Sequence, residues 1–212
     1  MPFTVLTAEA LVNAASQLAK DDRRLARILK TYGPPPLWRR PATFTTLVRI
    51  ILEQQVSLKS ADAMFRKLQD SMRPFTPKNL IYLGSEHLRV LGVTRQKTAY
   101  LLHLASALAE GRLNLRQVSK MSDAEAKTTL MQIKGLGSWS ADVYMLMAMR
   151  RADIWPAGDL ALAVAVQELN ELENRPSFQQ LESLAEKWRP YRAVAARMLW
   201  QYYLATKRNG AP

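Results

Sequence analysis

The sequence has no cysteine and only two histidines, His87 and His103, among its 212 residues. The lack of cysteine excludes disulfides, thiolate zinc sites and cysteine-held iron–sulfur clusters. Neither histidine is close to a pair of acidic residues in the sequence, so we interpret both as surface or packing residues rather than metal ligands.

Long apolar runs and strand-like patterns are also lacking. No apolar run reaches the roughly 18–20 residues that cross a bilayer, and the N-terminal segment lacks the positive charge and apolar core of a signal peptide. We therefore expect no membrane association and a place inside the cell, cytoplasmic in a bacterium or nuclear in a eukaryote. No stretch alternates apolar and polar residues over a useful length. We predict an all-α protein with short helices and tight connections.

Apolar residues recur at helical spacing along most of the chain. Residues 7–33 follow this pattern until the sequence GPPP, where proline ends the helix. Residues 43–72 predict one or two further helices, and residues 76–113 predict three short helical segments. The segments are separated by glycines, namely Gly84, Gly92 and Gly111.

A capping box marks the start of the next predicted helix. Ser122 precedes Glu125 by three residues, a spacing that satisfies two unpaired N–H groups and predicts a helix over about 123–133. The sequence KGLGS then requires a sharp turn, and a second helix is expected to begin near Ser138.

Two glycines in this turn, Gly135 and Gly137, suit the binding of a phosphate. They leave backbone N–H groups open at the positive end of the second helix, where an anion binds well. Such a turn holds a nucleic-acid backbone without reading its sequence. A plain αα-hairpin with packing glycines explains the same pattern, so the motif alone does not decide between them.

The charge balance favours a polyanionic partner. Thirty basic residues against eighteen acidic ones give a net charge of +12, which points to nucleic acid rather than to a merely soluble basic protein. Charge is also segregated, because residues 159–186 hold six acids and one base while residues 187–208 hold six bases and no acid. These bases predict a basic face, and they are Lys187, Arg189, Arg192, Arg197, Lys207 and Arg208.

The segment LMQIKGLGSWSADVYMLMAM, residues 130–149, resembles the helix–hairpin–helix of the HhH-GPD superfamily of DNA glycosylases. Downstream, WPAGDLALAVAV resembles the Gly/Pro-rich loop and catalytic aspartate of that superfamily. Its other core segments are similar to IILEQQVSLKSA, LGVTRQKTAYLLHLA and AEKWRPYRAVAARMLW. The order and spacing match the 3-methyladenine DNA glycosylase II type over roughly residues 20–203. The resemblance implies a minimal form without the extra N-terminal domain of some relatives.

Asp159 matches the catalytic aspartate of the family. An aspartate directly before Leu160 is also a good helix N-cap, and the two roles are compatible. Breaking a glycosidic bond builds oxocarbenium character on the sugar, and a nearby carboxylate stabilises that charge or orients the attacking water.

Trp139 stands two residues after Gly137, where strand-cutting members of the family have a lysine. Without an amine there, a Schiff-base lyase step is not expected. The resemblance therefore implies a monofunctional glycosylase that leaves an abasic site.

Aromatic residues of the alkylation branch line its base pocket, and here they match Trp139 and Trp200, with Tyr144 as a third member. An N-alkylated purine is cationic and stacks on indole with a gain of about 0.5–2 kcal/mol. Core packing is the alternative for each tryptophan. Val143 and Leu160 stand where relatives can have tyrosines, which predicts a wider or differently selective pocket.

By family position, Gln55 is the wedge that fills the gap left by a flipped base, although two solvated glutamines, Gln54 and Gln55, are the alternative. The predicted DNA contacts are Gln55, Ser57, Gly135, Gly137, Ser138 and Ser140. The family hairpin also binds a monovalent cation, Na⁺ or K⁺, through backbone carbonyls. The matching carbonyls are those of Met131, Ile133 and Leu136, and no cofactor is otherwise required.

The resemblance implies two helical lobes with a DNA-binding cleft between them. Residues 42–158 would form the central lobe, with the hairpin at about 123–149, and residues 1–41 with 159–212 the second lobe. Bases around the cleft would neutralise the phosphates of double-stranded DNA containing alkylated bases, with the protein acting as a monomer.

Two other functions fit the same residues. The first is a sister glycosylase for mismatched or oxidised bases, although neutral lesions need stronger help for the leaving group. The second is a non-enzymatic hairpin module that only binds or bends DNA.

Overall fold

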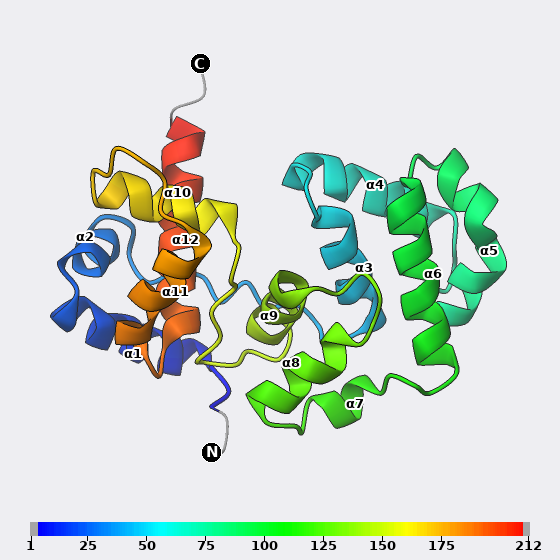
Figure 1. The fold of residues 1–212 in the computed structure, drawn as a ribbon, viewed down its shortest axis with the longest axis horizontal. Coiled ribbons are helices and arrows are strands. Elements are labelled where there is room, and N and C mark those ends of the chain that lie inside the picture. The colour runs from blue at the N-terminus through cyan, green and yellow to red at the C-terminus, as the bar shows by residue number, and fades with distance from the viewer. Residues whose placement is uncertain (1–3, 210–212) are drawn as a thin grey trace. The chain divides into compact units, whose positions relative to one another are not determined.

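The computed structural model describes residues 4–209, which fold almost entirely into helices (Figure 1). Within this range, extended structure is limited to an isolated antiparallel bridge between Val5 and Arg151. The predicted all-α class is therefore confirmed. None of the helices within residues 4–209 is long and apolar enough to cross a membrane.

The chain divides into two compact units. Residues 40–144 form one, here the middle unit, and residues 4–39 pack with residues 145–209 in the other, here the terminal unit. The sequence prediction instead drew the boundaries at 42 and 158. Residues after 145 belong with the terminal unit because the Leu6 N–H donates to the Arg150 carbonyl at 2.8 Å and the Ala193 N–H to the Ala152 carbonyl at 3.0 Å.

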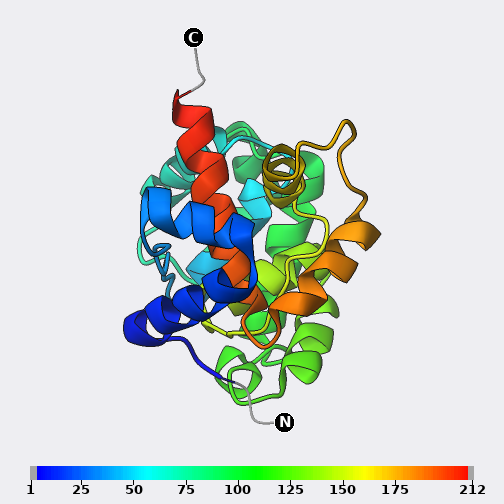
Figure 2. The ribbon, with the colours of Figure 1, turned by 90° about the vertical axis from the view of Figure 1, so that its left-hand side faces the viewer.

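The terminal unit is built around its last helix. Its helices are α1 (Ala8–Asp21), α2 (Arg23–Tyr32), α10 (Leu160–Leu169), α11 (Phe178–Ala185), the short 3₁₀ helix η1 (Glu186–Trp188) and α12 (Arg192–Asn209). Helix α12 is buried on every side over residues 193–200, and α1, α2 and α10 pack against it (Figure 2). A helix enclosed in this way holds its side chains in fixed positions, and one of them is Trp200.

The helical pattern of residues 7–33 forms two helices rather than one. Asp22 interrupts it with an extended backbone, φ −131° and ψ 108°. The Asp22 carboxylate accepts the N–H groups of Arg24 and Leu25 at 2.9 and 3.3 Å and so caps α2. The break lets α1 and α2 both pack against α12.

The middle unit holds the remaining helices. They are α3 (Phe44–Glu53), α4 (Leu58–Asp70), α5 (Pro77–Val90), α6 (Arg95–Ala109), α7 (Leu115–Val118), α8 (Asp123–Met131) and the first part of α9 (Ser138–Met147). Most of α3 is buried and packs against α4 and α6. Helix α5 bends at Gly84, where φ is 77°, as the predicted short segments require.

The two helices predicted around the glycine turn are confirmed. Ser122 and Glu125 form the capping box, with the Ser122 N–H donating to the Glu125 carboxylate at 2.9 Å. Helix α8 then ends at Met131, two residues before the predicted end, and α9 begins at Ser138 as predicted. Six residues, from Gln132 to Gly137, make the turn between them.

Candidate functional site

The two glycines of the hairpin turn serve different purposes. Gly135 has φ 98°, and a Cβ atom there would lie 2.3 Å from Cγ of Tyr100, so only glycine fits against that ring. A Cβ atom on Gly137 would meet nothing within 4 Å. Gly135 therefore secures the packing of the turn, and Gly137 leaves the open space that an approaching phosphate needs.

Gln54 ties the end of α3 to the hairpin. Its Nε2 donates to the Gly135 carbonyl at 2.8 Å and to Oγ of Ser140 at 2.9 Å. Ser140 is 2% exposed, so its hydroxyl is held inside the unit, and a DNA contact from this side chain has no room. Ser138 is only partly buried and is the first residue of α9, so its predicted DNA contact stays a prediction.

A buried ion pair joins the two hairpin helices. Asp142 on α9 has a side chain 2% exposed, and its Oδ2 lies 2.8 Å from Nζ of Lys127 on α8. The Ser138 hydroxyl donates to the same oxygen at 3.4 Å. The sequence reasoning missed this pair. A lone acid within the apolar run of α9 was the available indication, because a buried charge requires a partner.

Gln55 follows Gln54 in the sequence but does not take part in its contacts with the hairpin. It is exposed and has φ 56°, in the left-handed region that a glutamine rarely adopts. Ser57 follows as the N-cap of α4, accepting the Ser60 N–H at 3.1 Å. Gln55 therefore lies in a turn and not within a helix, and its role as the wedge stays a prediction.

The aromatic residues of α9 differ in exposure. Trp139 is partly buried, one residue into the helix. Tyr144 is 1% exposed, and its hydroxyl has no hydrogen-bond partner among residues 4–209. Burial raises the pKa of this phenol well above its usual value of 10. Tyr144 thus brings an unsatisfied buried hydroxyl, which a polar group of a ligand would stabilise.

Asp159 is the N-cap of α10, as the sequence allowed. It is 8% exposed, and its Oδ1 accepts the Leu162 N–H at 3.0 Å. The same oxygen accepts Nε1–H of Trp200 at 3.1 Å. Gly158, with φ 83°, makes the turn that directs Asp159 toward α12. The carboxylate is therefore fixed by a helix start and by an indole that lies 41 residues further along the chain.

Trp200 is buried at 8% exposure and is itself contacted by an aromatic residue that the sequence reasoning did not include. The ring of Trp38 lies edge-on, with centroids 6.4 Å apart and planes at 64°. The Trp200 indole therefore holds the carboxylate through its Nε1–H, and the base-stacking role that its family position implies stays a prediction.

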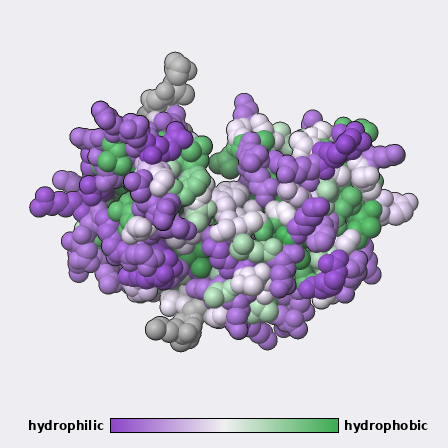
Figure 3. Space-filling view, viewed as in Figure 1, coloured by the Kyte–Doolittle hydropathy of each residue, from purple (hydrophilic) through white to green (hydrophobic). Residues whose placement is uncertain are grey.

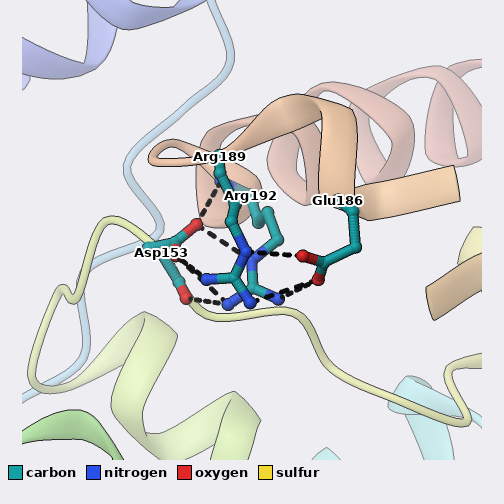
Figure 4. A network of polar contacts seen from close by, with 4 residues as sticks. All are labelled: Asp153, Glu186, Arg189 and Arg192. Atoms are coloured by element: carbon teal, nitrogen blue, oxygen red, sulfur yellow. Dashed lines mark hydrogen bonds and ion pairs between the residues drawn. The ribbon is translucent and has the colours of Figure 1, made fainter. Parts of the chain in front are cut away.

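The described bases of residues 187–208, predicted to form a basic face, are engaged in contacts within the protein. Arg189 and Arg192 bind Asp153 and Glu186 in a network with distances of 2.6–3.0 Å (Figure 4). The remaining described bases are also engaged, since Lys187 pairs with Asp22, Lys207 with Glu168, and Arg197 donates to three backbone carbonyls. The side chain of Arg208 lies outside the described residues. Linear charge segregation failed here because acids distant in sequence fold back onto these bases.

Exposed bases also lie on α1 and α2, where the surface is mainly hydrophilic (Figure 3). They are Lys20, Arg23, Arg24, Arg27 and Lys30.

The carbonyls proposed to hold a monovalent cation lie in the hairpin turn. Met131 ends α8, so its carbonyl lies beyond the regular helical hydrogen bonds. The Ile133 carbonyl accepts the Leu136 N–H at 2.9 Å and keeps a second lone pair. Neutral oxygen donors of this kind suit Na⁺ or K⁺, and the site remains a proposal. Among residues 4–209, no group of three or more His, Cys, Asp or Glu side chains forms another metal site.

Residues 48–190 match a known family, described as HhH-GPD superfamily base excision DNA repair protein. The matched residues include the hairpin, Gln54 at the end of α3 and the capped Asp159. The chain belongs to the HhH-GPD superfamily. Trp38 and Trp200 fall outside the matched residues, so the indoles near Asp159 are supplied by parts of the chain that the family match does not include.

Individual HhH-GPD proteins resemble this chain over most of its length. The alkylbase DNA glycosidase-like protein mag2 of Schizosaccharomyces pombe is 28% identical over 195 residues, 89% of this chain and 92% of that protein. DNA-3-methyladenine glycosylase 1 of the same organism is 26% identical, over 88% of this chain and 83% of that one. The solved structure of S. pombe 3-methyladenine DNA glycosylase Mag1 with abasic DNA superposes with a TM-score of 0.82 at 25% identity, covering 89% and 95%.

Proposed function

We propose that this protein is a monofunctional DNA glycosylase of base excision repair, which hydrolyses the N-glycosidic bond of alkylated purines such as 3-methyladenine and 7-methylguanine. The family and the names of its relatives support this activity. The observation that carries it is the buried carboxylate of Asp159, which lies within the residues that match the family and accepts both the Leu162 N–H and the Trp200 indole N–H. The proposed partner is double-stranded DNA, in the compartment where the cell keeps its DNA.

The reaction needs few catalytic groups other than the Asp159 carboxylate. The bond between C1′ and the base nitrogen breaks, and its electron pair leaves with the purine, which loses its positive charge. Asp159 stabilises the oxocarbenium character that develops on the sugar. Water then adds to C1′ and gives up a proton, which leaves an abasic site. An alkylated purine is already a good leaving group, so the absence of a histidine near Asp159 in the sequence is no obstacle.

Trp139 excludes the second reaction of some family members. A lyase step needs an amine that attacks C1′ to form a Schiff base, and an indole has none. Trp139 is only partly buried, and an indole is the side chain on which a cationic base stacks best. Val143 is buried and Leu160 is 55% exposed, so both positions where relatives can have tyrosines carry aliphatic side chains here.

DNA binding is assigned to the hairpin and to the loop after α3. The open start of α9 at Gly137 and Ser138 would hold a phosphate, with a monovalent cation in the turn behind it. The strained Gln55 would enter the stack when the base leaves it. Neither contact needs to recognise the DNA sequence, which suits an enzyme that acts on lesions in any sequence context.

A base-release panel tests the proposal. Duplexes carrying 7-methylguanine, 3-methyladenine, 8-oxoguanine or a mismatch are incubated with the wild type and with Asp159→Asn. We expect release of the methylated purines by the wild type only, no strand cleavage, and unchanged DNA affinity of the variant. Release from the oxidised or mismatched duplexes alone would support the sister enzyme, and DNA binding without any release would support the non-enzymatic module.

A further inference from the structure

Trp38 has a strained backbone. Its φ is 43°, in the left-handed region, where a bulky side chain is a genuine outlier. Residues held in this way persist only when their surroundings determine the conformation, and they are concentrated at functional sites. Trp38 is the only aromatic residue in this conformation among residues 4–209.

A buried arginine fixes the backbone next to Trp38. Nε of Arg197 donates to the Leu37 carbonyl at 3.1 Å, and its two terminal nitrogens donate to the carbonyls of Leu146 and Ala193 at 2.7 and 3.2 Å. Arg197 is completely buried, and burial lowers its pKa to about 10, so it is still charged at neutral pH. A charge enclosed in this way cannot give up its carbonyl partners without a large cost, which holds the residue before Trp38 against α12.

The side chain of Trp38 is thereby placed against Trp200, three residues after Arg197 on α12. The edge-on contact at 6.4 Å restricts the rotation of the Trp200 ring, and the orientation of that ring decides whether its Nε1–H reaches Asp159. The strain at Trp38 and the gain of one edge-to-face ring contact are of the same order. Stability alone therefore gives little reason to keep the strained tryptophan.

We infer that Trp38 is a positioning residue for Asp159, which acts by holding the indole of Trp200 on the carboxylate. This inference rests on the proposed glycosylase activity. Trp38 aligns the Trp200 indole and the Asp159 carboxylate and does not bind DNA. It therefore affects the rate of base release and not the affinity for the duplex.

The test uses Trp38→Ala, Trp38→Gly and Trp38→Phe in the full chain, with single-turnover and steady-state release of 7-methylguanine. We expect kcat to fall about tenfold in the Ala and Gly variants, because a misaligned group loses rate without losing substrate. KM and the DNA dissociation constant should stay within about twofold, and Trp38→Phe should keep most of kcat because phenyl preserves the edge contact. Trp38→Gly relieves the strained φ, so its thermal midpoint should equal or exceed that of Trp38→Ala.

A matched control lies close to this pair, because Tyr32 is the last residue of α2, six residues before Trp38, and Tyr202 follows Trp200 on α12. Tyr32 contacts Tyr202 of α12 edge-on, at 6.3 Å and 72°, and this ring pair is not part of the proposed chain from Trp38 through Trp200 to Asp159. Tyr32→Ala should lower the thermal midpoint and leave kcat per folded molecule unchanged. Wild-type kcat in all Trp38 variants, or an equal loss in Tyr32→Ala, would overturn the inference and leave the glycosylase proposal intact. No release by the wild type itself would overturn both.

Discussion

Two buried aspartates of the terminal unit are built on the same plan. Asp159 and Asp22 are 8% and 5% exposed, and each is the N-cap of a helix. Each also accepts Nε1–H of a tryptophan, Asp159 from Trp200 at 3.1 Å and Asp22 from Trp188 at 3.0 Å. A buried carboxylate with a capped helix and an indole donor is therefore not by itself a catalytic group.

The surroundings of Asp22 favour stability. Nζ of Lys187 lies 2.8 Å from its Oδ2, and the same ammonium lies 5.3 Å above the Trp188 ring. Trp155 packs on that ring at 5.5 Å. Burial alone would raise the pKa of Asp22, but the hydrogen bonds from Lys187 and Trp188 outweigh it, and the pKa lies below its usual 3.8.

The surroundings of Asp159 contain strain and exposed apolar surface instead. Gly158 before it has φ 83°, Leu160 after it is 55% exposed, and its tryptophan contacts the strained Trp38. Strain that lowers stability is retained where function needs it. The neighbours, and not the hydrogen-bond motif, distinguish the two aspartates.

Replacing each aspartate by asparagine is the strongest test of this distinction. Asn caps helices as well as Asp, so Asp159→Asn should fold normally while base release falls at least about a hundredfold, because the developing positive charge loses its counter-charge. Asp22→Asn should keep wild-type release per folded molecule and lose about 1–3 kcal/mol in the free energy of unfolding. Base release and urea denaturation measure the two properties. If both variants lose base release, or if both lose only stability, the distinction between the two aspartates is wrong.

Replacing the two donor tryptophans, Trp200 and Trp188, tests the same distinction between Asp159 and Asp22, with smaller expected effects. Trp200→Phe removes the donor to Asp159 and should lower kcat about tenfold, less than loss of a donor to the reacting atoms does, because this hydrogen bond only orients the carboxylate. Trp188→Phe removes the donor to Asp22 and should cost about 1 kcal/mol of stability with kcat unchanged. The two variants are compared by release kinetics and by thermal unfolding, and a loss of kcat in Trp188→Phe would contradict the assignment.

Local sequence patterns predicted the parts of the site that depend on nearby residues. The Ser122 capping box, the start of α9 at Ser138 and the cap at Asp159 are decided within a few residues, and all three are present. The roles proposed for Asp159 and Trp139 came from resemblance to the family and not from these patterns.

Contacts between distant segments could not be predicted in this way. Gln54 reaches the hairpin across 81 residues, and Trp38 meets Trp200 across most of the chain. Periodicity identifies the buried face of a helix but not which side chain of another helix it meets. The bases after residue 187 show the same limit, because their acidic partners include Asp22 and Asp153.

The pH dependence of stability provides a further test for Asp22. A carboxylate with a lowered folded-state pKa stabilises the protein above its unfolded value and loses that contribution as pH falls through the folded value. The usual pKa of 3.8 sets the upper end of this window. The stability gap between the wild type and Asp22→Asn should therefore be full at neutral pH and should shrink on titration toward about pH 3. Urea denaturation at both pH values measures the gap, and a constant gap would mean that ionisation of Asp22 contributes nothing.

Lys187→Met tests how much of the difference is due to charge, and its expected effect is the smallest. The lysine side chain is 44% exposed, so solvent screens both its ion pair with Asp22 and its contact with the Trp188 ring. We expect a loss of about 0.5 kcal/mol or less, reduced further by added salt. Arg24, Leu25 and Trp188 still donate to the carboxylate in this variant. A loss as large as that of Asp22→Asn would mean that the lysine, and not the hydrogen bonds, makes Asp22 a structural residue.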